Sequence, residues 1–132
     1  MSEIINPQDA ELEEVILGSC LIESKAITLI ADILRPEAFY NEKNLEIYAT
    51  LQSMYRNGQK IDIITVEEEL TRRGKLEFIG GPYTLAHISG RVASSAHLEY
   101  HARILKQKYI RRETILGFHK LLALAADETT DI

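Results

Sequence analysis

The last quarter of the chain places the strongest constraint on its fold. From Ala96 to Ala126 the sequence contains no proline and one glycine, Gly117. Proline and glycine are the residues that most often interrupt a helix, so this stretch predicts one continuous helix, with Ser95 as its N-terminal cap. A helix of about 31 residues is ~46 Å long, whereas a compact unit of about 93 residues is ~32 Å across. We therefore expect this helix to project beyond the rest of the molecule.

Apolar side chains on this segment change their pattern along its length. The early part carries one stripe at helical spacing, and the later part is apolar on several sides. These residues are Leu98, Ala102, Leu105 and Tyr109, followed by Ile115, Leu116, Phe118, Leu121, Leu122 and Leu124. A projecting helix does not leave such a surface exposed to water. We predict that these ten residues form an interface between chains, with the helix as one arm of a hairpin. The polar run 127–132 then marks a cut before the returning helix.

The N-terminal part predicts a helix that packs closely against a neighbour. Asn6 is a suitable N-cap and Pro7 a suitable first helical residue. The residues Leu12, Ile16 and Cys20 follow at helical spacing. Gly18 lies inside this helix, where it costs about 1 kcal/mol relative to alanine. We expect the close approach of another helix to explain that glycine.

The middle of the chain predicts short helices separated by turns. The boundary signals are Ser24 and Asn41 as caps of the second and third helices, Arg35-Pro36 and Gly58 as helix ends, Thr65 with Glu68 as a capping box for a helix over 66–73, the loop Gly80-Gly81, and a helix over 82–89. Phe39-Tyr40 is expected to fill the core. The fold class that follows is all-α. One domain comprises a compact head of five to six helices (1–94), a long helix (95–126) and a polar end (127–132).

A search for catalytic motifs in the sequence is negative. There is no GxxxxGK[ST] phosphate-binding loop, because Gly74-Lys75 lacks both the preceding glycine and the following hydroxyl. GxGxxG and CxxC are also absent. Ser94-Ser95 is better explained by helix capping than by nucleophilic catalysis, since no base lies nearby in sequence. We assign no catalytic, cofactor-binding or metal-binding residues.

Two local patterns support an alternative function, a stand-alone nucleic-acid-binding or metal-binding helical protein. His97 and His101 lie four residues apart, which allows two imidazoles to share a metal ion, but the sequence offers no evident third ligand. The basic run Lys106, Lys108, Arg111 and Arg112 could contact a phosphate backbone. Surface histidines and a solvated basic helix face are the simpler interpretations.

Charge and composition indicate an ordinary globular domain. The formal net charge is −5, which argues against autonomous nucleic-acid binding. Residues 1–70 carry −9 and residues 71–132 carry +4, a division that could favour packing within or between copies. The single cysteine, Cys20, is expected in the core. No apolar run of 18 residues and no secretory signal are visible. We therefore expect a cytoplasmic protein without a membrane span.

An ordered set of short motifs resembles the N-terminal domain of bacterial DnaB-type replicative DNA helicases. The matching segments are 7–22 (PQDAELEEVILGSCLI), Phe39-Tyr40, Gly58-Gln59, Asp62 with Thr65, Arg73-Gly74, Gly80-Gly81 and 93–96, and the match covers most of residues 7–126. The sequence departs from the family at Leu12, at Asn44 and at 90–92. Any partner contact at these positions is not carried over.

The resemblance implies a collar domain without catalytic activity of its own. In that family the ATP-hydrolysing motor, which uses ATP and magnesium, is a separate C-terminal RecA-like domain that this chain lacks. The N-terminal domains pair through a helical hairpin, and three pairs form the collar of a hexamer. They also take part in primase binding during DNA replication. The resemblance therefore implies self-association and primase as partners, with DNA bound through the complete ring.

Overall fold

The computed structural model describes residues 9–92 and 94–127, and in these residues it contains helices and no strand. Asn6 and Pro7, the predicted start of the first helix, lie outside the described residues. The elements in chain order are α1 (Ala10–Ile22), α2 (Ala26–Ile30), the 3-10 helix η1 (Pro36–Ala38), α3 (Glu42–Arg56), α4 (Ile63–Arg72), α5 (Leu76–Ile79), α6 (Pro82–Gly90) and α7 (Leu98–Ala126). The predicted all-α fold with a long C-terminal helix is confirmed.

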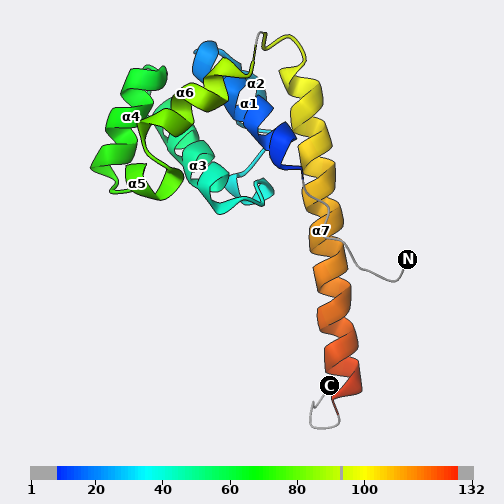
Figure 1. Ribbon diagram of the computed structural model, residues 1–132. Helices are drawn as coiled ribbons and strands as arrows, with labels where there is room; N and C mark the ends of the chain where they lie inside the picture. The colour runs from blue at the N-terminus through cyan, green and yellow to red at the C-terminus, as the bar shows by residue number, and fades with distance from the viewer. Residues whose placement is uncertain (1–8, 93, 128–132) are drawn as a thin grey trace.

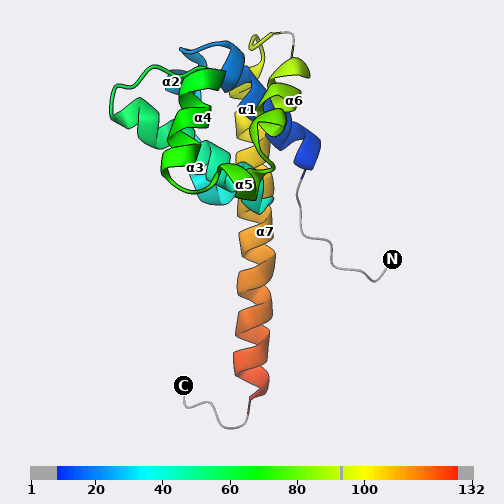
Figure 2. The ribbon, with the colours of Figure 1, turned by 60° about the vertical axis from the view of Figure 1, so that its left-hand side comes forward.

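The helices α1 to α6 form a compact head, and α7 runs along one side of it before extending well past it (Figures 1 and 2). The core contains apolar side chains from every α-helix, including the first two turns of α7. Phe39 and Tyr48 stack within it, with ring centroids 4.7 Å apart. Cys20 is fully buried, as the sequence predicted. Of the predicted Phe39-Tyr40 pair, only Phe39 is in the core, because Tyr40 is 44% exposed.

The first helix packs against α6 at Gly18. A Cβ atom on Gly18 would lie 2.5 Å from Val92 Cγ2 and 2.7 Å from the backbone oxygen of Ile88 in α6. Real Cβ atoms do not approach other atoms this closely, so glycine is required for the observed packing. The close approach of a neighbouring helix predicted from the sequence is therefore confirmed.

The start of α3 is held by two polar side chains, one local and one distant. Asn41 accepts hydrogen bonds from the backbone N–H groups of Lys43 and Asn44, which confirms its predicted role as N-cap. Glu13 of α1 is 1% exposed and accepts from the N–H groups of Tyr40 (2.7 Å) and Asn41 (3.3 Å) and from the Asn44 side chain (3.0 Å). These donors satisfy the buried carboxylate and fix α1 against α3.

Several predicted helix boundaries were wrong. The capping box of α4 is formed by Asp62 and Thr65 instead of Thr65 and Glu68, so this helix begins at Ile63. The second helix is preceded by Lys25, not Ser24, and ends at Ile30. A four-residue helix, α5, was not predicted at all. Asp62 and Thr65 are both suitable N-caps, so the local sequence does not decide between them. The helices α2 and α5 begin without a side-chain cap, so no capping signal marks their starts in the sequence.

The long helix begins at Leu98, two residues later than predicted. Its N-cap residue, His97, makes no capping hydrogen bond through its side chain. The predicted cap Ser95 contributes its backbone oxygen, which accepts from the N–H of Leu98 at 3.1 Å. From Leu98 to Ala126 the helix is uninterrupted, and Gly117 lies within it. The predicted single long helix is therefore confirmed.

Candidate assembly surface on the C-terminal helix

The ten residues predicted to form an inter-chain interface fall into two groups along α7. Leu98, Ala102 and Leu105 are all 0% exposed and belong to the core of the head. They pack within their own chain and offer no surface to a second one. Their assignment to an inter-chain contact is therefore corrected. A stripe of apolar residues indicates that a helix is covered, but the stripe does not say whether the same chain or a partner covers it.

Arg112 is the last residue of α7 that is buried against the head. The residue is 4% exposed, and Nη2 donates to the backbone oxygens of Glu37 and Ala38, both at 3.4 Å. The same group lies over the rings of Tyr40 and Tyr109, 5.2 and 5.4 Å from their centroids. Arg112 therefore joins α7 to the end of η1 and to the start of α3.

Sequence reasoning missed this role, although a signal was present. The spacing of Leu98, Ala102, Leu105, Tyr109 and Arg112 is that of a single helical stripe, so the buried face of α7 extends to Arg112. Because Arg112 is charged, it was assigned instead to a solvated basic face. Tyr109, the fourth predicted interface residue, is half-buried beside Arg112. It also lines a groove of about 310 Å³ between α7 and the segment from α2 to η1.

Beyond Arg112, residues 113–126 form what we call the distal segment. Its apolar side chains are exposed: Leu116 41%, Phe118 65%, Leu121 64%, Leu122 63% and Leu124 51%. Ile115 is half-buried. The segment lies past the head in both views (Figures 1 and 2). A row of large apolar side chains on a projecting helix is the usual sign of a protein contact.

These side chains cover an unusually wide part of the distal segment. At 3.6 residues per turn, the positions of Leu124, Leu121, Phe118, Leu122 and Ile115 extend over about 180° of the helix circumference. Leu116 lies outside this arc. A helix that packs on one neighbour needs an apolar stripe only about 100° wide. The arc is therefore wide enough for two neighbouring helices.

The alternative functions receive little support from the structure. His97 and His101 are 6.3 Å apart between ring centroids, and within residues 9–92 and 94–127 no group of three or more His, Cys, Asp or Glu side chains could hold a metal ion. Lys106 and Arg111 are exposed, but the Arg112 guanidinium is buried against backbone oxygens. The basic run therefore presents less charge to a phosphate backbone than its sequence suggests.

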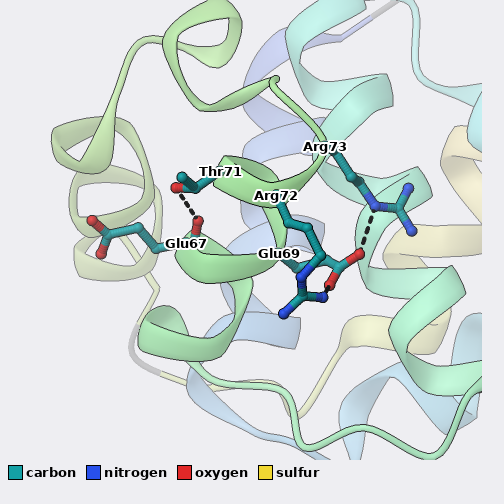
Figure 3. Close-up of polar contacts among 5 residues, drawn as sticks. All are labelled: Glu67, Glu69, Thr71, Arg72 and Arg73. Carbon is teal, nitrogen blue, oxygen red and sulfur yellow. Dashed lines mark hydrogen bonds and ion pairs between the residues drawn. The ribbon is translucent and has the colours of Figure 1, made fainter.

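Charged residues on α4 pair with one another along the helix (Figure 3). Glu69 forms ion pairs with Arg72 and with Arg73, the latter at 3.0 Å. The hydroxyl of Thr71 donates to the backbone oxygen of Glu67 at 2.8 Å. Both arginines at the end of this helix thus already have a carboxylate partner.

A hollow in the head lies near the start of α3. It measures about 580 Å³ and is lined by Ala10, Glu13, Tyr40, Asn41, Glu42, Lys43 and Phe78. The Glu13 carboxylate in its lining is already hydrogen-bonded to three donors.

Cys20 lies elsewhere in the core, and its burial raises the thiol pKa to about 12. This cysteine is therefore a packing residue and not a nucleophile.

Comparison with known proteins identifies the family. The family model described as DnaB-like helicase N terminal domain matches residues 5–107, and the chain belongs to that family. It is 43% identical over 108 residues to the replicative DNA helicase DnaB of Rhodothermus marinus, a match that covers 82% of this chain and 12% of that protein. It is 33% identical over 119 residues to the replicative DNA helicase DnaC of Bacillus subtilis, covering 87% and 26%.

Solved structures agree with this assignment. The N-terminal domain of DnaB helicase from Mycobacterium tuberculosis superposes with a TM-score of 0.88 at 30% identity, covering 93% of this chain and 89% of that one. A second structure is described as a DnaB-like replicative helicase and its interactions with primase. It matches with a TM-score of 0.76 at 28% identity, covering 87% of this chain and 27% of that one. The family resemblance read from the sequence is confirmed.

The chain spans only 12% to 26% of the length of these two curated relatives. The relatives are helicases, and this chain corresponds to their N-terminal domain. None of the helices in the described residues is both long and apolar enough to cross a membrane.

Proposed function

We propose that this chain is the N-terminal collar domain of a replicative DNA helicase and that it assembles through the distal segment of α7. The observation that carries the proposal is the wide exposed apolar arc on the distal segment of a chain that belongs to the DnaB-like N-terminal family. One part of the arc would pack on a returning helix that completes a hairpin. The other part would pack on a second copy, and three such pairs would form a hexameric collar.

The complete protein would couple this collar to DNA unwinding. A C-terminal RecA-like domain would bind ATP and magnesium and act on DNA in the cytoplasm, and this chain would have no ATPase activity by itself. Primase is the second proposed partner, because a relative with the same fold has a solved structure described as showing its interactions with primase. Helix contacts would set the geometry of the collar, and a bound partner would shift the balance between its conformations.

The dimer of this chain alone should be weak. Burial of one large apolar side chain contributes ~1.5–3 kcal/mol, so three of the six residues would contribute roughly 5–9 kcal/mol per chain. Association costs an estimated ~4–15 kcal/mol in lost freedom. These terms are of similar size, and the returning helix would add further area. We therefore expect a concentration-dependent dimer and no hexamer.

Sedimentation of the Leu121→Asp variant tests the proposal. A charge in the contact should weaken the dimer by roughly 10- to 100-fold, equivalent to ~1.4–2.8 kcal/mol, while the head remains folded. The matched control is Lys120→Asp. Lys120 lies about 100° round the helix from Leu121, on the face that also carries Glu113 and outside the apolar arc. If Leu121→Asp and wild type show the same monomer–dimer balance, the contact does not involve this face.

The alternative, a stand-alone DNA-binding protein that uses Lys106, Lys108 and Arg111, makes the opposite prediction. A basic strip should retard DNA in a mobility assay at low salt and lose this effect steeply as salt rises. The collar domain alone should bind little DNA at either salt concentration.

A further inference from the structure

The contacts of Arg112 suggest a role in conformation as well as packing. The group formed by Arg112, Tyr40, Tyr109 and the backbone oxygens of Glu37 and Ala38 is here called the clasp. It joins three parts of the chain: α7, the end of η1 and the residue before the N-cap of α3. These contacts join parts of a single chain, so the clasp is independent of the proposed function.

An arginine suits this position for a specific chemical reason. The backbone oxygens of Glu37 and Ala38 are at the C-terminal end of η1, where carbonyl groups lack partners within the helix and attract positive charge. The planar guanidinium can donate to both oxygens and lie over aromatic rings at the same time. Lysine could donate to the oxygens but could not stack on the two tyrosines.

The position of the clasp along α7 suits it to restrain the direction of that helix. The fully buried anchor residues of α7 are Leu98, Ala102 and Leu105. Arg112 is about 15 Å along the helix from Ala102, and it is the last buried residue before the distal segment. A restraint at the far end of a rod limits its tilt more strongly than one close to the pivot. A sideways shift at Arg112 would be magnified about 1.8-fold at Lys120, which lies about 27 Å from Ala102.

The clasp lies at the edge of the head and not in its centre. Tyr40 is 44% exposed and lines the hollow of about 580 Å³ beside Glu13. The fully buried residues of the apolar core, among them Leu98 and Leu105 at the base of α7, are separate from Arg112 and Tyr40, and Tyr109 packs against this core while being only half-buried.

We propose that the Arg112 clasp sets the angle at which α7 leaves the head, and that its release lets the distal segment swing while the head remains folded. Arg112 is then a positioning residue for whatever the distal segment contacts. The angle of α7 is adjustable through a side chain that lies far from the apolar arc itself.

Distance measurements between spin labels test the proposal. Labels are attached to cysteines introduced at Lys60, whose side chain is 79% exposed, and at Lys120, which is exposed and lies outside the apolar arc. The native Cys20 is fully buried and stays unlabelled in the folded protein. An excess of unlabelled protein removes distances between chains. Double electron–electron resonance then reports the distribution of distances between the head and the distal segment.

We expect a narrow distribution for wild type and one at least about 1.5-fold broader for Arg112→Met, which keeps an unbranched apolar side chain and removes the guanidinium. Arg112→Lys should give an intermediate width, because it restores the charge without the stacking. The control Arg111→Met, a change of the same kind at an exposed neighbour, should match wild type. A role limited to stability would lower the melting temperature without broadening the distribution below it.

The variants are compared only where they are folded. Helical circular dichroism and protection of Cys20 from thiol reagents establish whether each variant is folded. If Arg112→Met does not fold, Tyr109→Leu decides, because it removes one ring of the clasp and keeps an apolar side chain. Unchanged widths in the folded variants would show that the buried residues at the base of α7 fix its direction by themselves.

Discussion

The contact between α1 and α6 at Gly18 can be tested by adding a single methyl group. Gly18→Ala has two opposing effects. Alanine in a helix interior is favoured over glycine by about 1 kcal/mol. Its Cβ, however, would lie 2.5 Å from Val92 Cγ2 and 2.7 Å from the oxygen of Ile88. The valine methyl group can move, but the backbone oxygen belongs to α6 and can move only with that helix.

The steric term should exceed the propensity term. Forcing an extra methyl group into a packed core costs typically ~1–3 kcal/mol, and a backbone obstacle places Gly18→Ala at the upper end of that range. The expected net loss is ~1–2 kcal/mol in the free energy of unfolding. At roughly 3–5 °C per kcal/mol, between the values for domains of 60–100 and of 150–250 residues, the melting temperature should fall by roughly 3–10 °C.

Urea titration followed by helical circular dichroism measures this loss, with Gly90→Ala as the matched control. Gly90 ends α6 and its φ is not positive, and among the described residues no atom beyond its chain neighbours and the backbone of its own helix lies within 4 Å of an added Cβ. The control should be neutral or slightly stabilising. If Gly18→Ala is as stable as wild type, or differs from the control by less than about 1 kcal/mol, the steric reasoning is wrong.

Two further predictions concern Asp62 and Cys20. The pKa of the Asp62 carboxyl group is lowered, mainly because the carboxylate accepts a hydrogen bond from the backbone N–H of Thr65. Asp62 therefore stabilises the folded state fully above its unfolded-state pKa, and this stabilisation is lost as the pH falls through the lower folded-state pKa. Asp62→Ala should therefore lose ~1 kcal/mol of unfolding free energy at pH 7, and the stability curves of variant and wild type should converge on acidification below about pH 3.9. Cys20 is fully buried, and burial raises its thiol pKa to about 12. It should therefore react with a thiol reagent only at the rate at which the protein unfolds. Rapid reaction of the folded protein would contradict the position of Cys20 in the core.

The sequence was most informative where one residue type performs a local task. The cap at Asn41 and the long helix that ends at Ala126 were predicted correctly, because each depends on backbone geometry near the residue itself. The close approach at Gly18 was also predicted correctly, because a glycine inside a helix marks a missing side chain, but the identity of the neighbour, α6, was not predicted. The capping box of α4 was misplaced by one helical turn. Asp62, Thr65 and Glu68 all have suitable side chains, and local sequence alone does not rank them.

Long-range relations were harder to predict from the sequence. Leu98, Ala102 and Leu105 were assigned to an inter-chain surface, but they pack within their own chain. Arg112 was assigned to a solvated basic face, although its guanidinium is buried against backbone oxygens from residues more than 70 positions earlier. Helical periodicity places Arg112 on the buried face of α7, but it does not say which distant residues the tertiary fold brings against that face.

The buried carboxylate of Glu13 has a consequence for the order in which this chain can fold. The donors that it accepts from are 27 to 31 residues later in sequence, and two of them are backbone N–H groups immediately before α3. Without the other helix, α1 would leave the Glu13 carboxyl group without these donors, and the backbone N–H groups of Tyr40 and Asn41 would lose their acceptor. The two helices should therefore gain and lose their structure together. The Glu13 carboxyl group thus couples α1 to the start of α3 across the chain that separates them.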